Sequence, residues 1–376
     1  MAKKEVNRWE AVAKNEKRAE KIINKACKKV GYNRKSLPGK VRSFLTCLFI
    51  TLAVTLVISI AGIYSLIWIC VNGPSDRARY LFVTSVKESS AAGFLANLFV
   101  PDLEVNHILY SGESEEIYED TDTDLIQIPT DNDQDSGQQG GDVGSEQEEI
   151  PNIVIEDVMG ATFRGKIAII RDPSTVKLAI SGEYSETATG KYLGKIVEGE
   201  NAVLGVNASG FEDEGGSGSG ALPTGLVISD GQLLWGEEDK KYDIIGFDSN
   251  NILILDSMTA GEAVENGIRD AVSFGPVLIK NGKAIYKNGG VNPRTAIGQR
   301  ADGAVLLLVV EGRQVASIGA TLRDLTNIML DYGAVNAANL DGGSSSSLFY
   351  DGKYVIEGSY VFGVRKIPNA FVVTEK

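Results

Sequence analysis

A carboxylate beside two glycines marks the stretch of this chain that is best suited to chemistry. Residues 334–347 read AVNAANLDGGSSSS, so a short apolar strand predicted over residues 334–340 ends in Asp341, Gly342 and Gly343. Glycines next to a carboxylate let the backbone approach a ligand closely, and successive N–H groups in such a turn can cradle an anion. A tight turn with a solvated aspartate is the competing interpretation, and the local pattern alone favours neither.

The element that must position this turn is a helix predicted over residues 321–332. Thr321 and Asp324 have the spacing of a capping box, and Gly333 suits the left-handed end of a helix. The apolar stripe of this helix consists of Leu322, Leu325, Ile328 and Met329.

The sequence contains a single histidine, His107, and this excludes most schemes of nucleophilic catalysis. A Ser-His-Asp or Cys-His centre needs an imidazole near its nucleophile, but His107 precedes an acidic stretch that separates it from the C-terminal region. The three cysteines lie within the first 70 residues, which excludes a cysteine zinc site in that region. No cofactor is certain; carboxylates and carbonyls remain suitable for a hard divalent cation such as calcium, so the metal requirement stays unknown.

Carboxylate and guanidinium chemistry remains. Carboxylate pairs are the usual groups that cleave a glycosidic bond, and the arginine fork matches phosphate oxygens. The candidate acids or bases are Asp341, Glu212, Asp213, Glu214 and Asp324, and the candidate anion clamps are Arg294 and Arg300. Each has a structural alternative: a surface ion pair for Arg294, a solvated loop for residues 212–214, and a helix cap for Asp324.

Charge is placed very unevenly along the chain. The net charge is −13, but residues 1–42 hold 14 Lys/Arg and 4 Asp/Glu and predict a basic cytoplasmic tail. Residues 43–71 contain no charged side chain, and 29 such residues exceed the ~20 that cross a bilayer. We therefore expect an uncleaved anchor with its N-terminus in the cytoplasm and the C-terminal domain outside the cell, in the cell membrane. The acidic remainder argues against nucleic-acid binding.

Composition predicts three further parts. Residues 72–110 are expected to form a juxtamembrane segment. Within it, residues 94–99 can form a short amphipathic helix that lies on the membrane or pairs with a neighbour, and packing of the same side chains in a core is an equal alternative. Residues 111–152 are acidic and predict a disordered linker. Residues 153–376 alternate short apolar runs with turn signals and are expected to contain few helices. One of the apolar runs predicts a single strand over residues 271–279. This pattern predicts an α+β domain with a mixed, mostly antiparallel sheet.

Taken together, the motifs of residues 160–376 resemble the phosphodiester glycosidase family, which includes N-acetylglucosamine-1-phosphodiester α-N-acetylglucosaminidase, the uncovering enzyme. The matching segments, in order, are NASGF at 207–211, PTG at 223–225, SFGP at 273–276, NPRTAIG at 292–298 and NLDGGSS at 339–345. The chain departs from many members at Ala208-Ser209 and at Ser344, where they carry glycine.

The resemblance implies a hydrolase that removes a sugar, typically N-acetylglucosamine, from a sugar-1-phosphodiester. On this basis Arg294 would hold the phosphate with support from Thr295, and the turn at Gly342 and Gly343 would lend N–H groups. Asp341 would act as base, nucleophile or sugar-hydroxyl anchor, with Glu212 and Asp213 as candidates for the second carboxylate. The remaining expected substrate contacts are Asn207, Gly210, Asn339 and Ser344.

The sequence thus predicts a membrane-anchored, single-pass hydrolase of the cell envelope, of a bacterial and Gram-positive type. Its expected partner is a phosphodiester-linked glycan or a teichoic-acid-like polymer of the wall or capsule, and its oligomeric state is left open. Two other classes remain: a non-catalytic module that binds sugar-phosphate polymers, and a structural protein of envelope assembly. Sugar release, binding without release, or indifference to substitution of Arg294 and Asp341 would separate the three.

Overall fold

A computed structural model describes residues 17–18, 21, 25, 39–89, 92–110, 119–129, 151–213, 218–357 and 363–375. The chain divides into two units, Met1–Ile67 and Trp68–Lys376. The first unit holds most of helix α2 (Gly39–Asn72). The stretch Ser43–Asn72 of this helix is by length and composition long and apolar enough to cross a membrane. Most of the basic tail lies outside the described residues.

Three short helices begin the second unit. They are α3 (Asp76–Lys87), α4 (Phe94–Phe99) and α5 (Asp102–Tyr110). Buried Val83, Ala96 and Val105 join them, and an ion pair of 2.7 Å links Arg79 to Glu104. The predicted helix over residues 94–99 is therefore confirmed. Its Ala96 is buried, whereas the apolar side chains of Phe94 and Leu98 are exposed.

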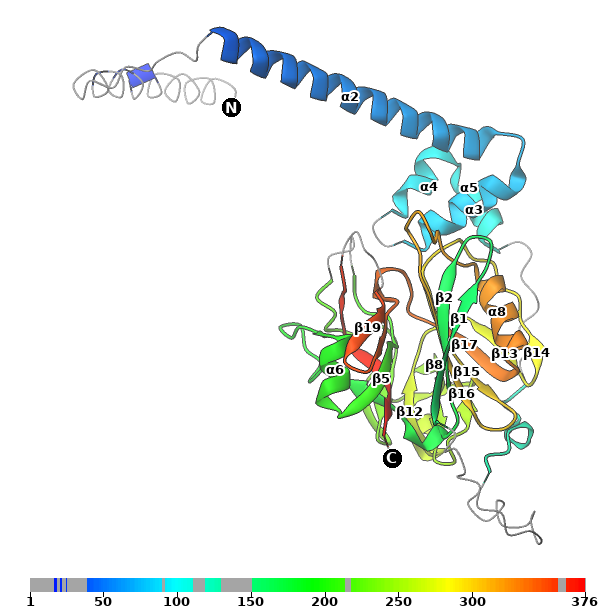
Figure 1. The fold of residues 1–376 in the computed structure, drawn as a ribbon. Helices are drawn as coiled ribbons and strands as arrows, with labels where there is room; N and C mark the ends of the chain where they lie inside the picture. The colour runs from blue at the N-terminus through cyan, green and yellow to red at the C-terminus, as the bar shows by residue number, and fades with distance from the viewer. Residues whose placement is uncertain are drawn as a thin grey trace, which may run out of the picture. The chain divides into compact units, whose positions relative to one another are not determined.

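The domain that follows is built around a seven-stranded sheet (Figure 1). Its strand order is β1 (Ile153–Met159), β2 (Arg164–Ile170), β16 (Val305–Val310), β15 (Arg294–Arg300), β17 (Ala334–Leu340), β13 (Val277–Lys280) and β14 (Lys283–Ala284). Strand β16 reads VLLLVV and is buried throughout, as expected for a strand covered on both faces. Helix α8 (Leu322–Asp331) packs its apolar stripe on one of these faces (Figure 1).

Two five-stranded sheets contribute to the core on the other face. One has the order β10 (Leu253–Ile254), β9 (Ile245–Asp248), β12 (Ile268–Val272), β6 (Val227–Ser229) and β7 (Gln232–Trp235). The other has the order β19 (Lys353–Ile356), β18 (Leu348–Tyr350), β5 (Ala202–Asn207), β21 (Asn369–Thr374) and β3 (Val176–Ile180). Phe247, Phe371 and Ile297 bring the three sheets into one apolar cluster, in which the two phenyl rings meet edge to face at 6.2 Å.

Smaller elements complete the domain. Strand β11 (Ser257–Thr259) pairs with β8 (Lys241–Asp243), and β20 (Lys366–Ile367) pairs with β4 (Lys191–Tyr192). Helices α6 (Leu193–Gly199) and α7 (Ala260–Glu265) cover the two five-stranded sheets. Every strand pairing in the described part of the chain is antiparallel, so the predicted α+β class with a mostly antiparallel sheet is confirmed.

The helix and strand that lead into the DGG turn have the predicted bounds and caps. The Thr321 hydroxyl accepts the Asp324 N–H at 3.2 Å, and the Asp324 carboxylate accepts the Thr321 N–H at 2.8 Å. Gly333 ends the helix at φ 82°, and β17 then covers residues 334–340. The capping-box interpretation of Asp324 is confirmed.

The single strand predicted over residues 271–279 is wrong. Its two halves are β12, in a five-stranded sheet, and β13, in the seven-stranded sheet, and residues 273–276 cross between them. An apolar run does not reveal such a crossing, although Pro276, which lacks an N–H, was a signal for a break. The crossing matters because Phe274, Gly275 and Pro276 line the pocket described below.

The linker prediction does not hold for residues 119–129. The Thr121 N–H and hydroxyl donate to Asp256 at 2.8 and 2.9 Å, Gln127 N–H donates to the Ala301 carbonyl at 2.8 Å, and Ile126 is buried. This short stretch therefore lies on the domain, because its few apolar and hydroxyl side chains find partners there. Residues 130–150, the larger part of the predicted linker, lie outside the described residues.

Candidate active site

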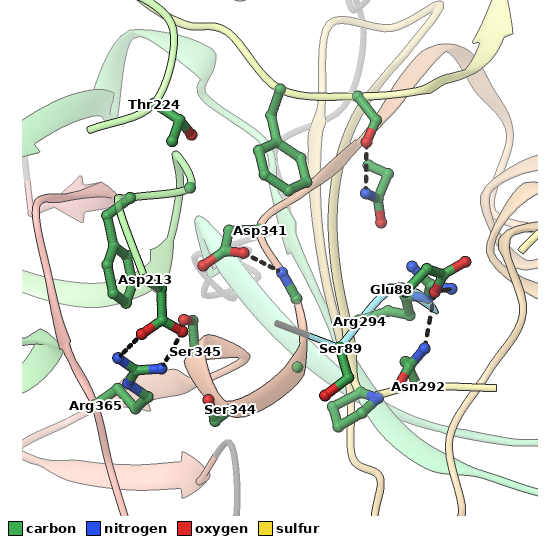
Figure 2. Close-up of a pocket in the computed structure, with 18 of the residues that line it drawn as sticks. Glu88, Ser89, Asp213, Thr224, Asn292, Arg294, Asp341, Ser344, Ser345 and Arg365 are labelled. Carbon is green, nitrogen blue, oxygen red and sulfur yellow. Dashed lines mark hydrogen bonds and ion pairs between the residues drawn. The ribbon is translucent and has the colours of Figure 1, made fainter. Parts of the chain in front are cut away.

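A pocket of about 850 Å³ opens beside the first residue of β15 and the turn after β17 (Figure 2). The antiparallel pairing of Thr295 with Leu340 brings these two strand ends together. The crossing at residues 273–276 and the segment after helix α3 add further walls. Its charged lining residues are Glu88, Asp213, Arg294, Arg313, Asp341 and Arg365. The pocket is therefore lined by the carboxyl groups of Asp213 and Asp341, by the guanidinium groups of Arg294 and Arg313, and by apolar side chains such as Phe274.

Asp341 is the titratable group at the centre of this pocket (Figure 2). Burial raises its pKa from 3.8 to about 7, although a hydrogen bond from Ser345, the Gly342 N–H and nearby Arg365 each lower it, and Asp213 raises it slightly. A carboxyl group with this pKa exchanges protons readily at neutral pH. Its main chain is held firmly, because the Asp341 N–H donates to the Ala208 carbonyl at 3.0 Å.

A second carboxylate, Asp213, lies on the same side of the pocket and is neutralised by Arg365. The two Arg365 nitrogens donate to the two Asp213 oxygens at 2.7 and 2.8 Å, which is the bidentate geometry that favours both charged forms. The hydrogen bond with Asp213 raises the pKa of Arg365. The pair therefore stays ionised, and Arg365 places positive charge near Asp341.

Arg294, the predicted phosphate clamp, is already engaged with the protein. It is 7% exposed, and its guanidinium donates to the carbonyls of Ala320 and Gly290 at 3.3 and 2.7 Å. It also forms an ion pair of 2.5 Å with Glu88. Arg294 thus reaches the pocket as a fixed charge with few free donors.

Arg313 is a second guanidinium on this side that the sequence did not single out. Burial and the neighbouring Arg294 lower its pKa, whereas Glu88 raises it. One of its nitrogens donates to Asn292 Oδ1 at 3.2 Å, and a side chain at Gly343 would lie 3.4 Å from the same guanidinium. Arg313 therefore lies against the DGG turn with donors left over for an anion.

Asn207 and Thr295 do not line the pocket but hold its strands together. Asn207 Nδ2 donates to the Asp341 carbonyl at 2.6 Å, and its Oδ1 accepts from the Thr295 hydroxyl at 2.8 Å and from the Ser347 N–H at 3.1 Å. Both side chains are fully buried. The geometry therefore favours a positioning role over the expected substrate contact.

The amides of the DGG turn are engaged within the protein rather than free for an anion. Gly342 N–H donates to Asp341 Oδ1 and Gly343 N–H donates to the Pro293 carbonyl, both at 2.9 Å. Gly343 has φ 63°, which favours glycine. The expected backbone cradle is thus absent from this turn, while both glycines and Ser344 still line the pocket.

Gly210 and Asn339 line the pocket as expected. A β-carbon on Gly210 would lie 2.7 Å from the Thr224 hydroxyl, so the glycine permits a close approach of two loops. Asn339 Nδ2 donates to the Gly275 carbonyl at 2.8 Å, while its buried Oδ1 has no partner. Because an unsatisfied buried acceptor is costly, this oxygen is suited to a donor on a ligand.

Three predicted candidates lie away from the pocket. Glu212 is exposed and is not among the lining residues. Arg300 lies at the opposite end of β15 from Arg294 and pairs with Asp302 at 2.8 Å. Asp324 serves the helix cap, as described above. Glu214 lies outside the described residues.

The residues that the sequence did not reveal come from distant segments. Glu88 and Arg294 are 206 positions apart, and Asp213 and Arg365 are 152 apart. No local spacing can mark such pairs. Among the described residues, no group of three or more His, Cys, Asp or Glu side chains is arranged to hold a metal ion.

The part of the chain that is similar to known proteins includes the motifs of the pocket. Residues 200–374 match the family model described as phosphodiester glycosidase. The chain is 30% identical over 193 residues to the SPbeta prophage-derived uncharacterized protein YomE of Bacillus subtilis (strain 168). It is 27% identical over 185 residues to the N-acetylglucosamine-1-phosphodiester alpha-N-acetylglucosaminidase of Bos taurus. These alignments cover 46% and 48% of this chain but only 28% and 32% of the two relatives.

The fold is also shared with a solved structure. The zebrafish N-acetylglucosamine-1-phosphodiester alpha-N-acetylglucosaminidase catalytic domain, described as auto-inhibited by its pro-peptide, superposes with a TM-score of 0.50 at 20% identity. The superposition covers 62% of this chain and 87% of that one. At this identity the likeness speaks for the fold.

Proposed function

We propose that this chain, whose residues 200–374 form a domain of the phosphodiester glycosidase family, cleaves the bond between a sugar's anomeric carbon and a phosphodiester. The bovine relative is named for this reaction on N-acetylglucosamine. One observation carries the proposal: a carboxyl group with a pKa near 7 shares a pocket with the guanidinium groups of Arg294 and Arg313.

The chemistry of the leaving group explains why these groups suffice. A phosphomonoester leaves as a stable anion, so the reaction needs positive charge near the phosphate more than an acid. Arg313 supplies donors for the phosphate, and Arg294, whose charge Glu88 balances, fixes the wall of the pocket beside it. In this scheme Asp341, as a carboxylate, takes a proton from the water that attacks the anomeric carbon. The electron pair of the broken bond stays on the phosphate oxygen.

Two further groups are suited to the sugar. The unpartnered Asn339 Oδ1 would accept a hydrogen bond from a sugar N–H or hydroxyl, and Ser344 at the pocket lining would contact a hydroxyl. The Asp213–Arg365 pair would hold the local charge near neutral while Asp341 changes protonation. The products are a free reducing sugar and a phosphomonoester.

The remainder of the chain supports a proposed place of action. Helix α2 has the length and apolar character of a membrane anchor, with an excess of basic residues before it. In the proposed arrangement the domain lies outside the cell and acts on phosphodiester-linked glycans of the envelope, such as teichoic-acid-like polymers. A cysteine-free ectodomain is compatible with this setting.

The test uses the full chain in detergent with a methyl phosphodiester of N-acetylglucosamine-1-phosphate. We expect free reducing sugar to appear with the wild type and to be lost by at least about 100-fold in Asp341→Asn, since one base typically contributes 10²–10⁴-fold. Arg313→Ala should raise KM about 10- to 100-fold, because charged hydrogen bonds are worth roughly 1.5–3 kcal/mol. Arg300→Ala, at the end of strand β15 that lies away from the pocket, is the matched control.

The outcomes separate the candidate classes. Full activity in both Asp341→Asn and Arg313→Ala would contradict this site assignment. Saturable binding of the substrate without sugar release would favour a recognition module. Neither binding nor release of several such phosphodiesters would contradict the proposed substrate class.

A further inference from the structure

Helix α3 and the residue after it bind the wall of the pocket, although they lie outside the region that matches the family. Five hydrogen bonds connect this segment to residues 289–294. The Tyr80 hydroxyl accepts Gly289 N–H at 3.3 Å, and the Ser85 hydroxyl accepts Val291 N–H at 2.9 Å. The other three converge on the carboxylate of Glu88.

The close fit at Gly290 indicates that this contact is specific. A β-carbon there would lie 2.2 Å from both the N and the Cα of Ser85, a distance that backbone atoms cannot relieve without moving apart. Glycine at this position therefore allows helix α3 to approach the loop that leads into Arg294. The residues that meet at this contact are Gly290, which has no side chain, and the backbone of Ser85.

Glu88 has the contacts of a residue that orients the cationic side of the pocket. Its Oε1 accepts Gly290 N–H at 2.8 Å. Its Oε2 accepts Asn292 Nδ2 at 2.8 Å and Arg294 Nη2 at 2.5 Å, and these three side chains lie together in Figure 2. The Arg294 side chain is only 8% exposed, so it needs a counter-charge. Among the described residues, Glu88 forms this ion pair.

The effect of Glu88 extends to Arg313 through Asn292. An amide has two distinct ends, and here Nδ2 donates to Glu88 while Oδ1 accepts from Arg313 Nη2 at 3.2 Å. Glu88 thereby selects which end of Asn292 faces Arg313. Without it, the amide is free to turn its donor toward a guanidinium, and that contact is repulsive.

We propose that Glu88 is a positioning residue for the phosphate side of the pocket, so that the juxtamembrane helix α3 completes a site otherwise built by the family domain. This inference rests on the proposed function, since it assigns the anion to Arg313. It implies that residues 151–376 alone lack a part of the active site, and that the site depends on the segment next to the anchor.

The experiment measures inorganic phosphate binding by calorimetry, together with KM and kcat, on the full chain in detergent. Glu88→Ala and Glu88→Gln should weaken phosphate binding about 10-fold or more and raise KM by a similar factor, because one charge-assisted contact is worth roughly 1.5–3 kcal/mol. A merely structural role would lower the active fraction and leave the phosphate affinity unchanged. The matched control Glu104→Gln breaks the Arg79 ion pair within the same helices without touching the pocket.

A second variant reaches the same contact from the other side. Gly290→Ala keeps Glu88 but separates helix α3 from the loop, so it should weaken phosphate binding by a similar factor. Gly199→Ala is its control, because no atom lies within 4 Å of the added carbon there. A double variant, Glu88→Ala with Gly290→Ala, should be no weaker than either single variant.

Each outcome of these measurements either upholds or overturns the inference about Glu88. Unchanged phosphate affinity in both Glu88→Ala and Gly290→Ala would overturn the inference. Tighter phosphate binding or higher activity in Glu88→Ala would also overturn it, because Glu88 would then be competing for the anion site. Phosphate binding that depends on Glu88 without any sugar release would uphold the inference and contradict the proposed function. Absence of phosphate binding by the wild type would overturn both.

Discussion

At the scale of single residues, the site depends on how burial changes the acidity of one carboxyl group. Burial is the largest effect on the pKa of Asp341 and raises it to about 7. Hydrogen bonds from Ser345 and Gly342 and the charge of Arg365 lower this pKa, and the charge of Asp213 raises it. The neighbouring Asp213 has a paired guanidinium, whereas Asp341 has none of its own. Two carboxylates in one pocket therefore have different tasks, which is the usual way in which one site separates proton transfer from charge balance.

The first prediction concerns the pH dependence of the reaction. If the carboxylate form of Asp341 is active, kcat/KM should rise with pH, be half-maximal near pH 7, and level off above it. The measurement is initial sugar release between pH 5 and 9, with Asp341→Asn as the variant that should lose the dependence together with the activity. A rate that falls as pH rises through 7 would instead mean that the protonated form acts.

The second prediction concerns stability and the same group. The folded pKa near 7 exceeds the ordinary 3.8, so the folded state holds its proton more tightly, and stability is lost as pH rises from about 4 to 7. Asp341→Asn removes this loss, and should be more stable than the wild type at pH 8 by up to about 4 kcal/mol and nearly equal at pH 4.

Thermal unfolding of both proteins across this pH range tests that prediction. Asp331→Asn, at an exposed position at the end of helix α8, should show no such difference. A wild type that is as stable as Asp341→Asn at pH 8 would show that the carboxyl group is not buried at this cost.

At the scale of elements, the pocket exists because three strand ends are joined at one point. Strand β5 ends in Asn207, β15 begins beside Thr295, and β17 runs into Asp341. The Asn207 amide bonds to the Asp341 carbonyl, the Thr295 hydroxyl and the Ser347 N–H that leads into β18, so it joins the end of its own strand to three other segments. The position of Asp341 is therefore a property of the strands as much as of its own turn.

The third prediction follows from this junction. Asn207→Ala leaves the Asp341 carbonyl, the Thr295 hydroxyl and the Ser347 N–H without these partners inside a dry core. The free energy of unfolding should fall by on the order of 2–4 kcal/mol, and sugar release should fall because Asp341 is less well fixed. Denaturant titration measures the first effect.

The exposed Asn250 offers a matched control. Asn250→Ala removes the same side chain from a surface turn and should change stability by less than about 0.5 kcal/mol beyond its local turn contacts. Equal effects of the two substitutions would contradict the junction at Asn207.

At the scale of the whole molecule, the domain of residues 153–376 and the helices that follow helix α2 belong to one unit. That unit begins at Trp68, and it includes helices α3, α4 and α5 as well as residues 119–129. If helix α2 spans a membrane, the pocket is tied through helix α3 to the segment next to the bilayer. The placement of the domain and the completeness of its pocket would then be linked.

The fourth prediction concerns this placement. In the proposed topology, the expressed chain should sediment with membranes, resist extraction at alkaline pH, and expose the C-terminal domain to protease added to whole cells. A tag on the N-terminus should stay protected. Release of a shortened domain into the medium would identify residues 43–72 as a cleaved signal instead.

The sequence by itself determined the features that depend on local pattern. The helix over residues 321–332 and the strand over residues 334–340 are specified by a cap, an apolar period and a terminal glycine, which act within a few residues. The apolar helix is specified by its composition. The resemblance to the phosphodiester glycosidase family rests on an ordered series of short motifs, and Asp341 could be chosen because it lies in the strongest of them.

Only the tertiary structure decided how those pieces act together. The apolar run at residues 271–279 proved to be two strands in two sheets, because hydrophobicity is the same in both and only packing separates them. The pocket is also lined by Arg313, Arg365 and Glu88, which the sequence did not single out. The predicted contacts Asn207 and Thr295 are buried and do not line it. Burial, counter-charge and pKa arise from neighbours that are remote in the chain, as in the 206-residue separation of Glu88 and Arg294, and no local pattern encodes them.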